Sequence, residues 1–194
     1  MRVLLLAPQP FYEDRGTPIA VALVLKVLSE RGTRVDVVTY HEGRDVELEH
    51  VTLHRIPRLP FVRGIRPGFS WKKIVCDAFL MLTAMRMAAR RRYDLVHAVE
   101  EAVFIALLLK WIFRIPYVYD MDSSLAQQLT DGVPLLRRAS TVLAACERLA
   151  LRHATAVVPV CEALAVVAER GHARKVVVLP DVSLLDGATD GFVR

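Results

Sequence analysis

The first forty residues, MRVLLLAPQPFYEDRGTPIAVALVLKVLSERGTRVDVVTY (1–40), decide the fold. They begin with an apolar run over residues 2–7, which predicts a buried strand. A polar loop leads to a helix that has Thr17 as its N-cap and Pro18 at its first helical position. This helix ends at Gly32, because glycine readily adopts the left-handed cap. A second strand over residues 35–40 completes a strand, helix and strand unit typical of parallel sheets.

The rest of the chain repeats this alternation. Further strands are expected at residues 51–56, 94–98, 116–121, 156–160 and 175–179. Further helices are expected at residues 71–92, 101–113, 134–152 and 162–170. Short apolar strands that alternate with helices predict an α/β fold with a doubly wound, mostly parallel, Rossmann-like sheet, because parallel strands need crossover connections that cover both faces.

The composition narrows the possible partners. The chain has 194 residues, the length of one domain, and 54% of them are hydrophobic. Its mean hydropathy of +0.33 favours a sheet that is covered on both faces and argues against disorder. The net charge of +5 favours anionic partners. There is no basic stripe interleaved with aromatic residues and no zinc-finger spacing, so we expect no nucleic acid partner.

No stretch of the sequence predicts export or a membrane span. The apolar N-terminal run is closed by Pro8 and is too short for a signal peptide. The longest apolar run, residues 102–109, is well below the ~20 residues of a membrane-spanning helix. The three cysteines, Cys76, Cys146 and Cys161, stand far apart and are expected to be buried free thiols. These features favour a cytoplasmic protein.

Missing motifs exclude several common α/β chemistries. The loop after the first strand carries Gly16-Thr17-Pro18 rather than GxGxxG, which disfavours a nicotinamide cofactor. The chain has neither a GxxxxGK[ST] phosphate loop nor a GxSxG nucleophile elbow. Gly16 nevertheless stands directly before a helix, where backbone N–H groups and the helix dipole favour a phosphate. A phosphate contact and a plain tight turn are both compatible with this glycine.

Four strings occur in order along the chain: YDLVHA (93–98), IPYVYD (115–120), AVVPVCEAL (156–164) and KVVVLP (175–180). They follow the glycine loop, a helix that ends in LSERG (28–32) and a strand VDVVT (35–39). This order resembles the opening half of the family-4 glycosyltransferases of the GT-B fold. The resemblance spans nearly the whole chain.

The resemblance implies a Rossmann-like N-terminal domain over residues 1–182 that holds a sugar or lipid-linked acceptor, followed by a linker or tail over residues 183–194. Most of the donor, a nucleoside diphosphate sugar, would be held by a C-terminal domain that is absent here, and the E-x7-E pair that grips it has no counterpart. The implied reaction is retaining transfer of the sugar to an acceptor hydroxyl. The donor is then a substrate, and neither a cofactor nor a metal is implied. We therefore expect negligible turnover from this chain alone.

The resemblance also implies roles for individual residues. Gly16 matches the position whose backbone approaches the donor diphosphate, and Thr17 could add its N–H group or hydroxyl. His97 closes a predicted strand at the carboxyl end, where open α/β sheets bind ligands, and is expected to be catalytic. Glu100 is expected to bind substrate hydroxyls. Glu101 is expected instead to complement a helix dipole.

A second group of candidates lies at the carboxyl end of the next predicted strand. Asp122 is expected to be catalytic, although many relatives carry a histidine at its place. Asp120, Ser123 and Ser124 are expected to bind substrate, and the two serines could equally cap the following helix. Glu162 is expected to be an ordinary acid at a helix N-terminus.

Two other functions remain open from the sequence. A non-catalytic sugar- or nucleotide-binding module, or a subunit completed by a separate C-terminal domain, would expose an apolar face where that domain packs. A peripheral membrane protein would lay the helix over residues 71–92 on the acidic inner face of a membrane. At the start of this helix we expect a core Trp71 flanked by two solvated lysines, Lys72 and Lys73.

Overall fold

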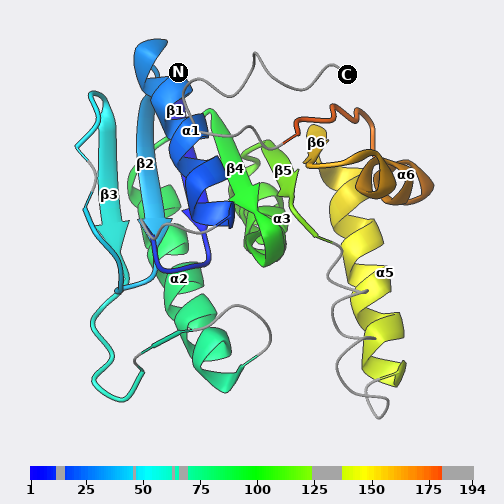
Figure 1. The fold of residues 1–194 in the computed structure, drawn as a ribbon, viewed down its shortest axis with the longest axis horizontal. Coiled ribbons are helices and arrows are strands. Elements are labelled where there is room, and N and C mark those ends of the chain that lie inside the picture. Colours follow the sequence, from blue (N-terminus) through cyan, green and yellow to red (C-terminus); the bar gives the residue numbers. More distant parts are fainter. Residues whose placement is uncertain (12–15, 46, 63, 66–69, 124–136, 181–194) are drawn as a thin grey trace, which may run out of the picture.

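The computed structural model describes residues 1–11, 16–45, 47–62, 64–65, 70–123 and 137–180. They form an α/β fold with a parallel six-stranded sheet in the order β3-β2-β1-β4-β5-β6 (Figure 1). The strands are β1 (Arg2–Ala7), β2 (Arg34–Thr39), β3 (Val51–Arg55), β4 (Leu95–Val99), β5 (Tyr117–Met121) and β6 (Ala156–Pro159). The predicted doubly wound parallel sheet is confirmed.

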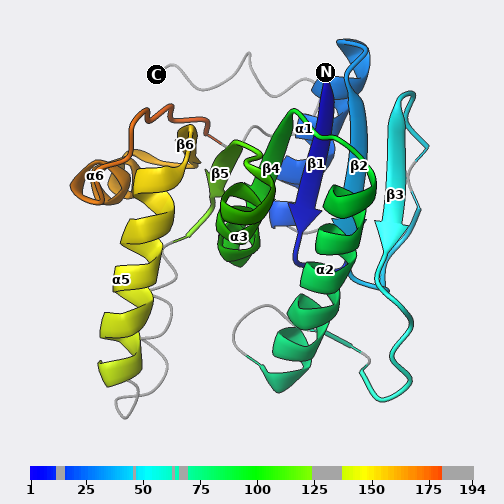
Figure 2. The ribbon, with the colours of Figure 1, turned by 180° about the vertical axis from the view of Figure 1, so that it is seen from behind.

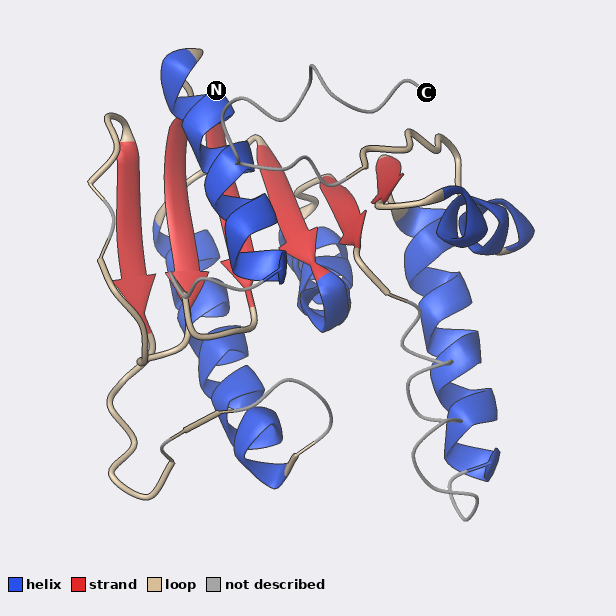
Figure 3. Cartoon of the chain, viewed as in Figure 1, coloured by secondary structure: helices blue, strands red, loops and turns tan. Residues whose placement is uncertain are grey.

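Helices cover both faces of the sheet. They are α1 (Gly16–Glu30), α2 (Trp71–Arg90), α3 (Val103–Phe113), α5 (Arg137–His153) and α6 (Glu162–Arg170), with a short 3-10 turn, η1 (Glu100–Ala102). Opposite views show α1 on one face and α2 and α3 on the other (Figures 1 and 2). Figure 3 shows the strands as one layer between these helices. Within the described residues, no helix is both long and apolar enough to cross a membrane.

β1 contributes to two hydrophobic cores, because successive side chains of a strand point to opposite faces of the sheet. Leu4 and Leu6 belong to the core under α2 and α3, where they join residues such as Leu80. Val3 and Leu5 belong to the core under α1. All five side chains are buried. A central strand of this kind must be apolar at every position, which explains the unbroken run at residues 2–7.

The ends of α1 differ in how well the sequence predicts them. α1 begins at Gly16, so Thr17 lies in its first turn and is not the N-cap that we expected. The C-terminal end is as predicted, because Gly32 has a φ of 66°. There the Thr33 N–H donates to the Leu28 carbonyl at 3.0 Å, as in a Schellman motif.

The expected strand over residues 175–179 is wrong. This segment forms one isolated parallel bridge, between Val157 and Val176, instead of a seventh strand among the described residues. The Val157 N–H donates to the Lys175 carbonyl at 2.8 Å, and the Leu179 N–H donates to the Pro159 carbonyl at 3.0 Å. The segment therefore runs beside β6 without a continuous ladder.

The cysteines are free, but only one is buried as expected. Cys76 of α2 is fully buried in the core beside the sheet. Cys146 and Cys161 are exposed, so the expectation of buried thiols is wrong for these two. Cys146 lies on an outer face of α5, and Cys161 is the residue directly before α6.

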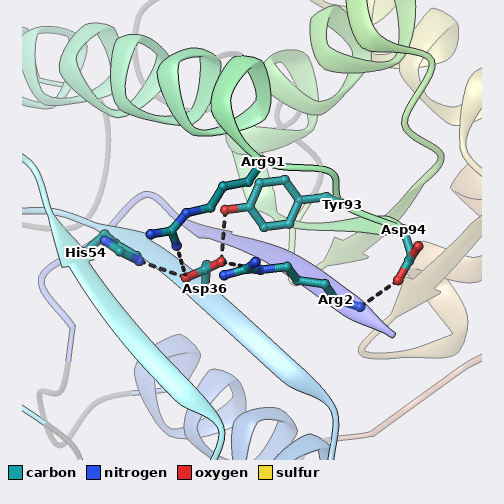
Figure 4. Close-up of polar contacts among 6 residues, drawn as sticks. All are labelled: Arg2, Asp36, His54, Arg91, Tyr93 and Asp94. Carbon is teal, nitrogen blue, oxygen red and sulfur yellow. Dashed lines mark hydrogen bonds and ion pairs between the residues drawn. The ribbon is translucent and has the colours of Figure 1, made fainter.

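A buried carboxylate, Asp36 of β2, ties the amino-terminal part of the sheet together (Figure 4). The Arg2 Nε atom, the His54 Nε2 atom and the Tyr93 hydroxyl each lie 2.9 Å from an Asp36 oxygen. Arg91 Nη1 donates at 3.1 Å. Burial alone would raise the pKa of Asp36, but the hydrogen bonds and the charge of Arg2 outweigh it and hold the pKa below its usual value. The Asp36 hub thus links β1, β2, β3 and the connection between α2 and β4.

Candidate active site

His97 and Asp120 form a polar pair on one face of the sheet. Asp120 is the next-to-last residue of β5, but His97 lies in the middle of β4 and does not close the strand in the way that we expected. The register pairs Val99 of β4 with Asp120 of β5, so His97, two residues before Val99, lies on the same face as Asp120. The His97 Nε2 and Asp120 Oδ2 atoms are 2.9 Å apart, and the side chains are 13% and 14% exposed. Two of the expected site residues are therefore brought together, with the carboxylate orienting the imidazole ring.

Glu100 follows β4 directly and has a strained backbone. Its φ is 47°, in the left-handed region, where a non-glycine residue is strained by about 1 kcal/mol or more. Its side chain is 18% exposed. Burial first, and then the negative charge of Glu101, raise the pKa of Glu100 to about 7, although the charge of Lys73 acts in the opposite direction. Glu100 therefore presents a carboxyl group that can exchange a proton near neutral pH.

Lys73, in the first turn of α2, lies between the two glutamates. Its ammonium group forms an ion pair with Glu101 Oε1 and lies 4.0 Å from Glu100 Oε2. The Lys73 side chain is 17% exposed. Burial opposes its charge, but the two carboxylates outweigh burial and raise the pKa of Lys73. Lys73 therefore holds a positive charge inside the site, and Glu101 is a member of this ion pair in addition to lying at the start of η1.

Asp77, one turn further along α2, adds a third acid to this group. The Tyr40 hydroxyl, at the end of β2, donates to Asp77 Oδ1 at 2.5 Å. Burial first, and then the charge of Glu101, raise the pKa of Asp77 to about 7, against the hydrogen bond from Tyr40. Burial also raises the pKa of Tyr40 far above its usual range, so the phenol remains protonated and keeps donating. We call Asp77, Glu100 and Glu101 the carboxylate cluster.

The expectation for the start of α2 is reversed. Trp71 is 61% exposed and is not a core residue. Lys73 is largely buried and paired rather than solvated. Ser70 is the N-cap, and its hydroxyl accepts a hydrogen bond from the Lys73 N–H at 3.3 Å. Lys73 lies three and seven residues before the buried Cys76 and Leu80, on the same face of α2. Residue 73, and not residue 71, then faces the sheet.

The remaining expected site residues lie at the same edge or outside the described residues. Asp122 directly follows β5, and its charge contributes to the raised pKa of Glu100, so the two carboxyls are near one another. Ser123 comes next, and Ser124 lies outside the described residues. Gly16 and Thr17 begin α1, which directs its N-terminal N–H groups toward the carboxyl edge of a parallel sheet. Glu162 is the first residue of α6, as expected.

The part of the chain that the structure describes contains no group of three or more histidine, cysteine or acidic side chains arranged to hold a metal ion. The acids of the carboxylate cluster are instead compensated by Lys73 and by protonation, since two of their pKa values lie near 7. These acids can form hydrogen bonds with hydroxyl groups and can exchange protons.

Three residues of the site were missed by sequence reasoning: Tyr40, Lys73 and Asp77. A signal was present for two of them. Lys73 and Asp77 are four residues apart, so a helix over this segment places them on one face. Tyr40 carries no such signal, because its contact with Asp77 spans 37 residues and depends on the sheet order.

A parallel sheet with polar side chains near its carboxyl edge and a helix N-terminus beside it is the arrangement of α/β domains that bind ligands at this edge. The comparisons with known proteins narrow this class. The chain belongs to the glycosyl transferase 4-like domain family, whose model matches residues 15–181. The predicted family is confirmed, and no curated protein matches the chain.

Solved glycosyltransferases share the fold at low sequence identity. Sucrose-phosphate synthase from Thermosynechococcus elongatus matches with a TM-score of 0.72 and 16% identity over 94% of this chain and 48% of that chain. The catalytic domain of starch synthase IV from Arabidopsis thaliana, bound to ADP and acarbose, matches with a TM-score of 0.61 and 14% identity over 93% of this chain and 51% of that one. Arabidopsis thaliana UGT89C1 complexed with UDP matches with a TM-score of 0.59 and 13% identity over 95% of this chain and 50% of that one. The chain thus spans about half the length of these proteins.

Proposed function

We propose that this domain holds the acceptor side of a glycosyltransferase, which transfers a sugar from a nucleoside diphosphate sugar to an acceptor hydroxyl when a second domain completes the cleft. The observation that carries the proposal is the His97–Asp120 pair, 2.9 Å apart on β4 and β5, together with the strained Glu100 that directly follows β4. Membership of the family supports the reaction class. The retaining stereochemistry rests on the resemblance alone.

Each side chain at this edge has a chemical role in the proposal. Asp120 orients His97, whose other ring nitrogen, Nδ1, can form a hydrogen bond with a substrate hydroxyl. Asp122 accepts a hydrogen bond from a hydroxyl near the reacting carbon, in the place where many relatives have a histidine. Glu100, with its raised pKa of about 7, can donate or accept a hydrogen bond depending on its protonation state. Ser123 and Ser124 extend this set of polar groups along the same connection.

The donor diphosphate is placed at the N-terminus of α1. Backbone N–H groups at Gly16 and Thr17 would meet the phosphate oxygens, and the helix dipole would favour their negative charge. The carboxylate cluster is a poor neighbour for a diphosphate, so the rest of the phosphate-binding charge is assigned to the second domain. The donor is a substrate, and the proposal needs neither a cofactor nor a metal.

We place the acceptor, a sugar or a lipid-linked sugar, in the cytoplasm at the inner face of a membrane. Large apolar side chains are exposed in the first turn of α2 and in the connection that precedes it: Trp71 is 61% exposed, Ile74 52% and Phe61 88%. Aromatic side chains of this kind suit a lipid interface. Sedimentation with lipid vesicles measures this part of the proposal. Trp71→Ala should reduce the fraction of protein that sediments with the vesicles. An unchanged fraction would contradict the placement of the acceptor at a membrane.

Calorimetry with UDP, ADP and their sugar conjugates tests the site. Gly16→Val should abolish binding of both the nucleotides and their conjugates, because the added side chain obstructs the helix N-terminus. Asp120→Asn should weaken binding of the sugar conjugates at least about tenfold and leave the plain nucleotides unchanged. Asp94→Asn is the matched control, because Asp94 is an exposed aspartate before β4, at the opposite edge of the sheet.

The outcomes separate the alternatives. Equal weakening by Asp120→Asn and Asp94→Asn would contradict the placement of the sugar at the carboxyl edge. Absence of nucleotide binding by the wild type would contradict the donor contact and favour an acceptor-only module that depends on a partner. Turnover by the isolated chain would contradict the requirement for a second domain.

A further inference from the structure

Three neighbouring hollows line the amino-terminal edge of the sheet, opposite the candidate active site. The largest, of about 560 Å³, is bordered by the ends of α2 and α3 and includes Arg90, Arg92 and Arg114. The second, of about 380 Å³, shares Asp94 with it. The third, of about 230 Å³, shares Arg2 and Arg34 with the second. Shared lining residues make the three hollows one continuous surface, which we call the amino-edge trough.

The trough is strongly basic. Its arginines are Arg2, Arg34, Arg90, Arg91, Arg92 and Arg114. Its acids are Asp36 and Asp94. Asp36 is already compensated by two of the arginines, at 2.9 and 3.1 Å. The other four guanidinium groups form no ion pair with any residue that the structure describes, so the trough carries an unbalanced positive charge.

Neutralisation of helix ends does not account for this surplus. The C-terminal ends of α2 and α3 each carry a partial charge of about −0.5, or about −1 together. With Asp94, the local negative charge is about −2, against three uncompensated guanidinium groups around the largest hollow alone. Arg114 has a φ of 60°, a conformation that favours glycine, so the cap of α3 does not require an arginine side chain.

We propose that the amino-edge trough binds a ligand that carries two or more phosphate groups. The planar guanidinium fork matches phosphate oxygens with two parallel hydrogen bonds, which makes arginine better suited than lysine to this ligand. The volume of the largest hollow, about 560 Å³, lies within the range of about 300–1,000 Å³ that is usual for small-molecule sites. A free oligophosphate and a phosphorylated lipid headgroup share this chemistry. The trough lies at the edge opposite the proposed donor contact, so this inference does not depend on the proposed function.

Calorimetric titration with inorganic tripolyphosphate tests the trough. The double variant Arg92→Gln/Arg114→Gln should bind at least about tenfold more weakly than the wild type, and wild-type binding should weaken as salt is raised. The control Lys26→Gln/Arg148→Gln removes the same charge from exposed positions on α1 and α5 and should bind like the wild type. Gly16→Val removes the proposed donor-phosphate contact, so the double variant is also compared in the Gly16→Val background, where the tenfold loss should persist.

A second arm uses vesicles that contain phosphatidic acid, in order to distinguish the two sources of phosphate. Binding to tripolyphosphate that is lost in the double variant supports a soluble ligand. Binding to vesicles alone, lost in the same variant, supports a lipid headgroup. Equal weakening in the control variant would overturn the proposal, because it would show a diffuse charge effect. Unchanged binding in the double variant in the Gly16→Val background, or no binding in either arm, would overturn it as well.

Discussion

Replacing Asp36 with asparagine tests the Asp36 hub. The carboxylate is 3% exposed and accepts bonds from Arg2, His54, Arg91 and Tyr93. Asparagine keeps the shape but replaces one accepting oxygen with an NH₂ group that faces donors. Two charge-assisted bonds are lost, each worth about 1.5–3 kcal/mol.

That total must be reduced, because exposed partners are screened by solvent. The Arg2 and Arg91 side chains are 37% and 44% exposed. Reducing the total by about half leaves an expected loss of about 1.5–3 kcal/mol in the free energy of unfolding at pH 7. Urea denaturation of both proteins measures this difference. Asp94→Asn is the control, because its exposed carboxylate accepts one backbone bond, at 2.7 Å, and should cost less than about 1 kcal/mol.

The pH dependence of this difference has a definite sign. Because the native pKa of Asp36 is lowered, its stabilisation is fully present above the unfolded pKa, near 4, and is lost as pH falls through the native value. The gap between wild type and Asp36→Asn should therefore narrow in strong acid. A loss at pH 7 below about 0.5 kcal/mol, or no larger than that of Asp94→Asn, would refute this account of the hub.

Three further predictions concern stability. Asp77→Asn should flatten the fall in unfolding free energy between about pH 4 and pH 7. The pKa of Asp77 is raised to about 7 in the folded protein, so over this range the unfolded chain loses the proton while the folded protein keeps it, and the wild type becomes less stable. Urea denaturation at pH 5 and pH 8 measures the change. Tyr119→Phe should leave the melting temperature unchanged or raise it, because the buried Tyr119 hydroxyl has no hydrogen-bond partner among the described residues. Tyr117→Phe should instead lower the free energy of unfolding by about 1 kcal/mol, because the Tyr117 hydroxyl donates to the Ala150 carbonyl of α5 at 2.5 Å. Gly43→Ala should lower the free energy of unfolding by more than about 2 kcal/mol in urea denaturation, because Gly43 has a φ of 111° and a Cβ there would lie 1.7 Å from the Phe11 carbonyl oxygen. Gly64→Ala should lower it by only about 1 kcal/mol, because a Cβ at Gly64 would meet nothing within 4 Å and only the positive φ is unfavourable.

The sheet could be predicted because its signals are local. Each strand is a short apolar run, and α6 begins at Glu162 and ends at Arg170, as the pattern indicates. The segment at residues 175–179 has the same apolar character, yet it forms only a bridge beside β6. A strand needs a partner along its whole length, and the availability of a partner is a tertiary property that the sequence pattern does not contain.

The candidate site could be predicted only in part. The proximity of His97 and Asp120 follows from their positions on neighbouring parallel strands. The position of His97 was predicted wrongly, because it lies in the middle of β4 instead of closing the strand. Lys73 was misjudged because lysine is usually solvated, whereas here it compensates the carboxylate cluster. The strain at Glu100 has no sequence signal, since its backbone conformation is imposed by the junction between β4 and η1.

The Asp36 hub also bears on the order in which a growing chain can acquire structure. Asp36 and its partner Tyr93 are 57 residues apart, so at a synthesis rate of roughly 5–20 residues per second the ribosome adds the second about 3–11 seconds after the first. During that interval β1, β2 and β3 would have to bury the Asp36 carboxylate without the hydrogen bonds from Arg91 and Tyr93. We therefore expect the nascent amino-terminal strands to stay open, and exposed to chaperones, until the segment around Tyr93 has left the exit tunnel.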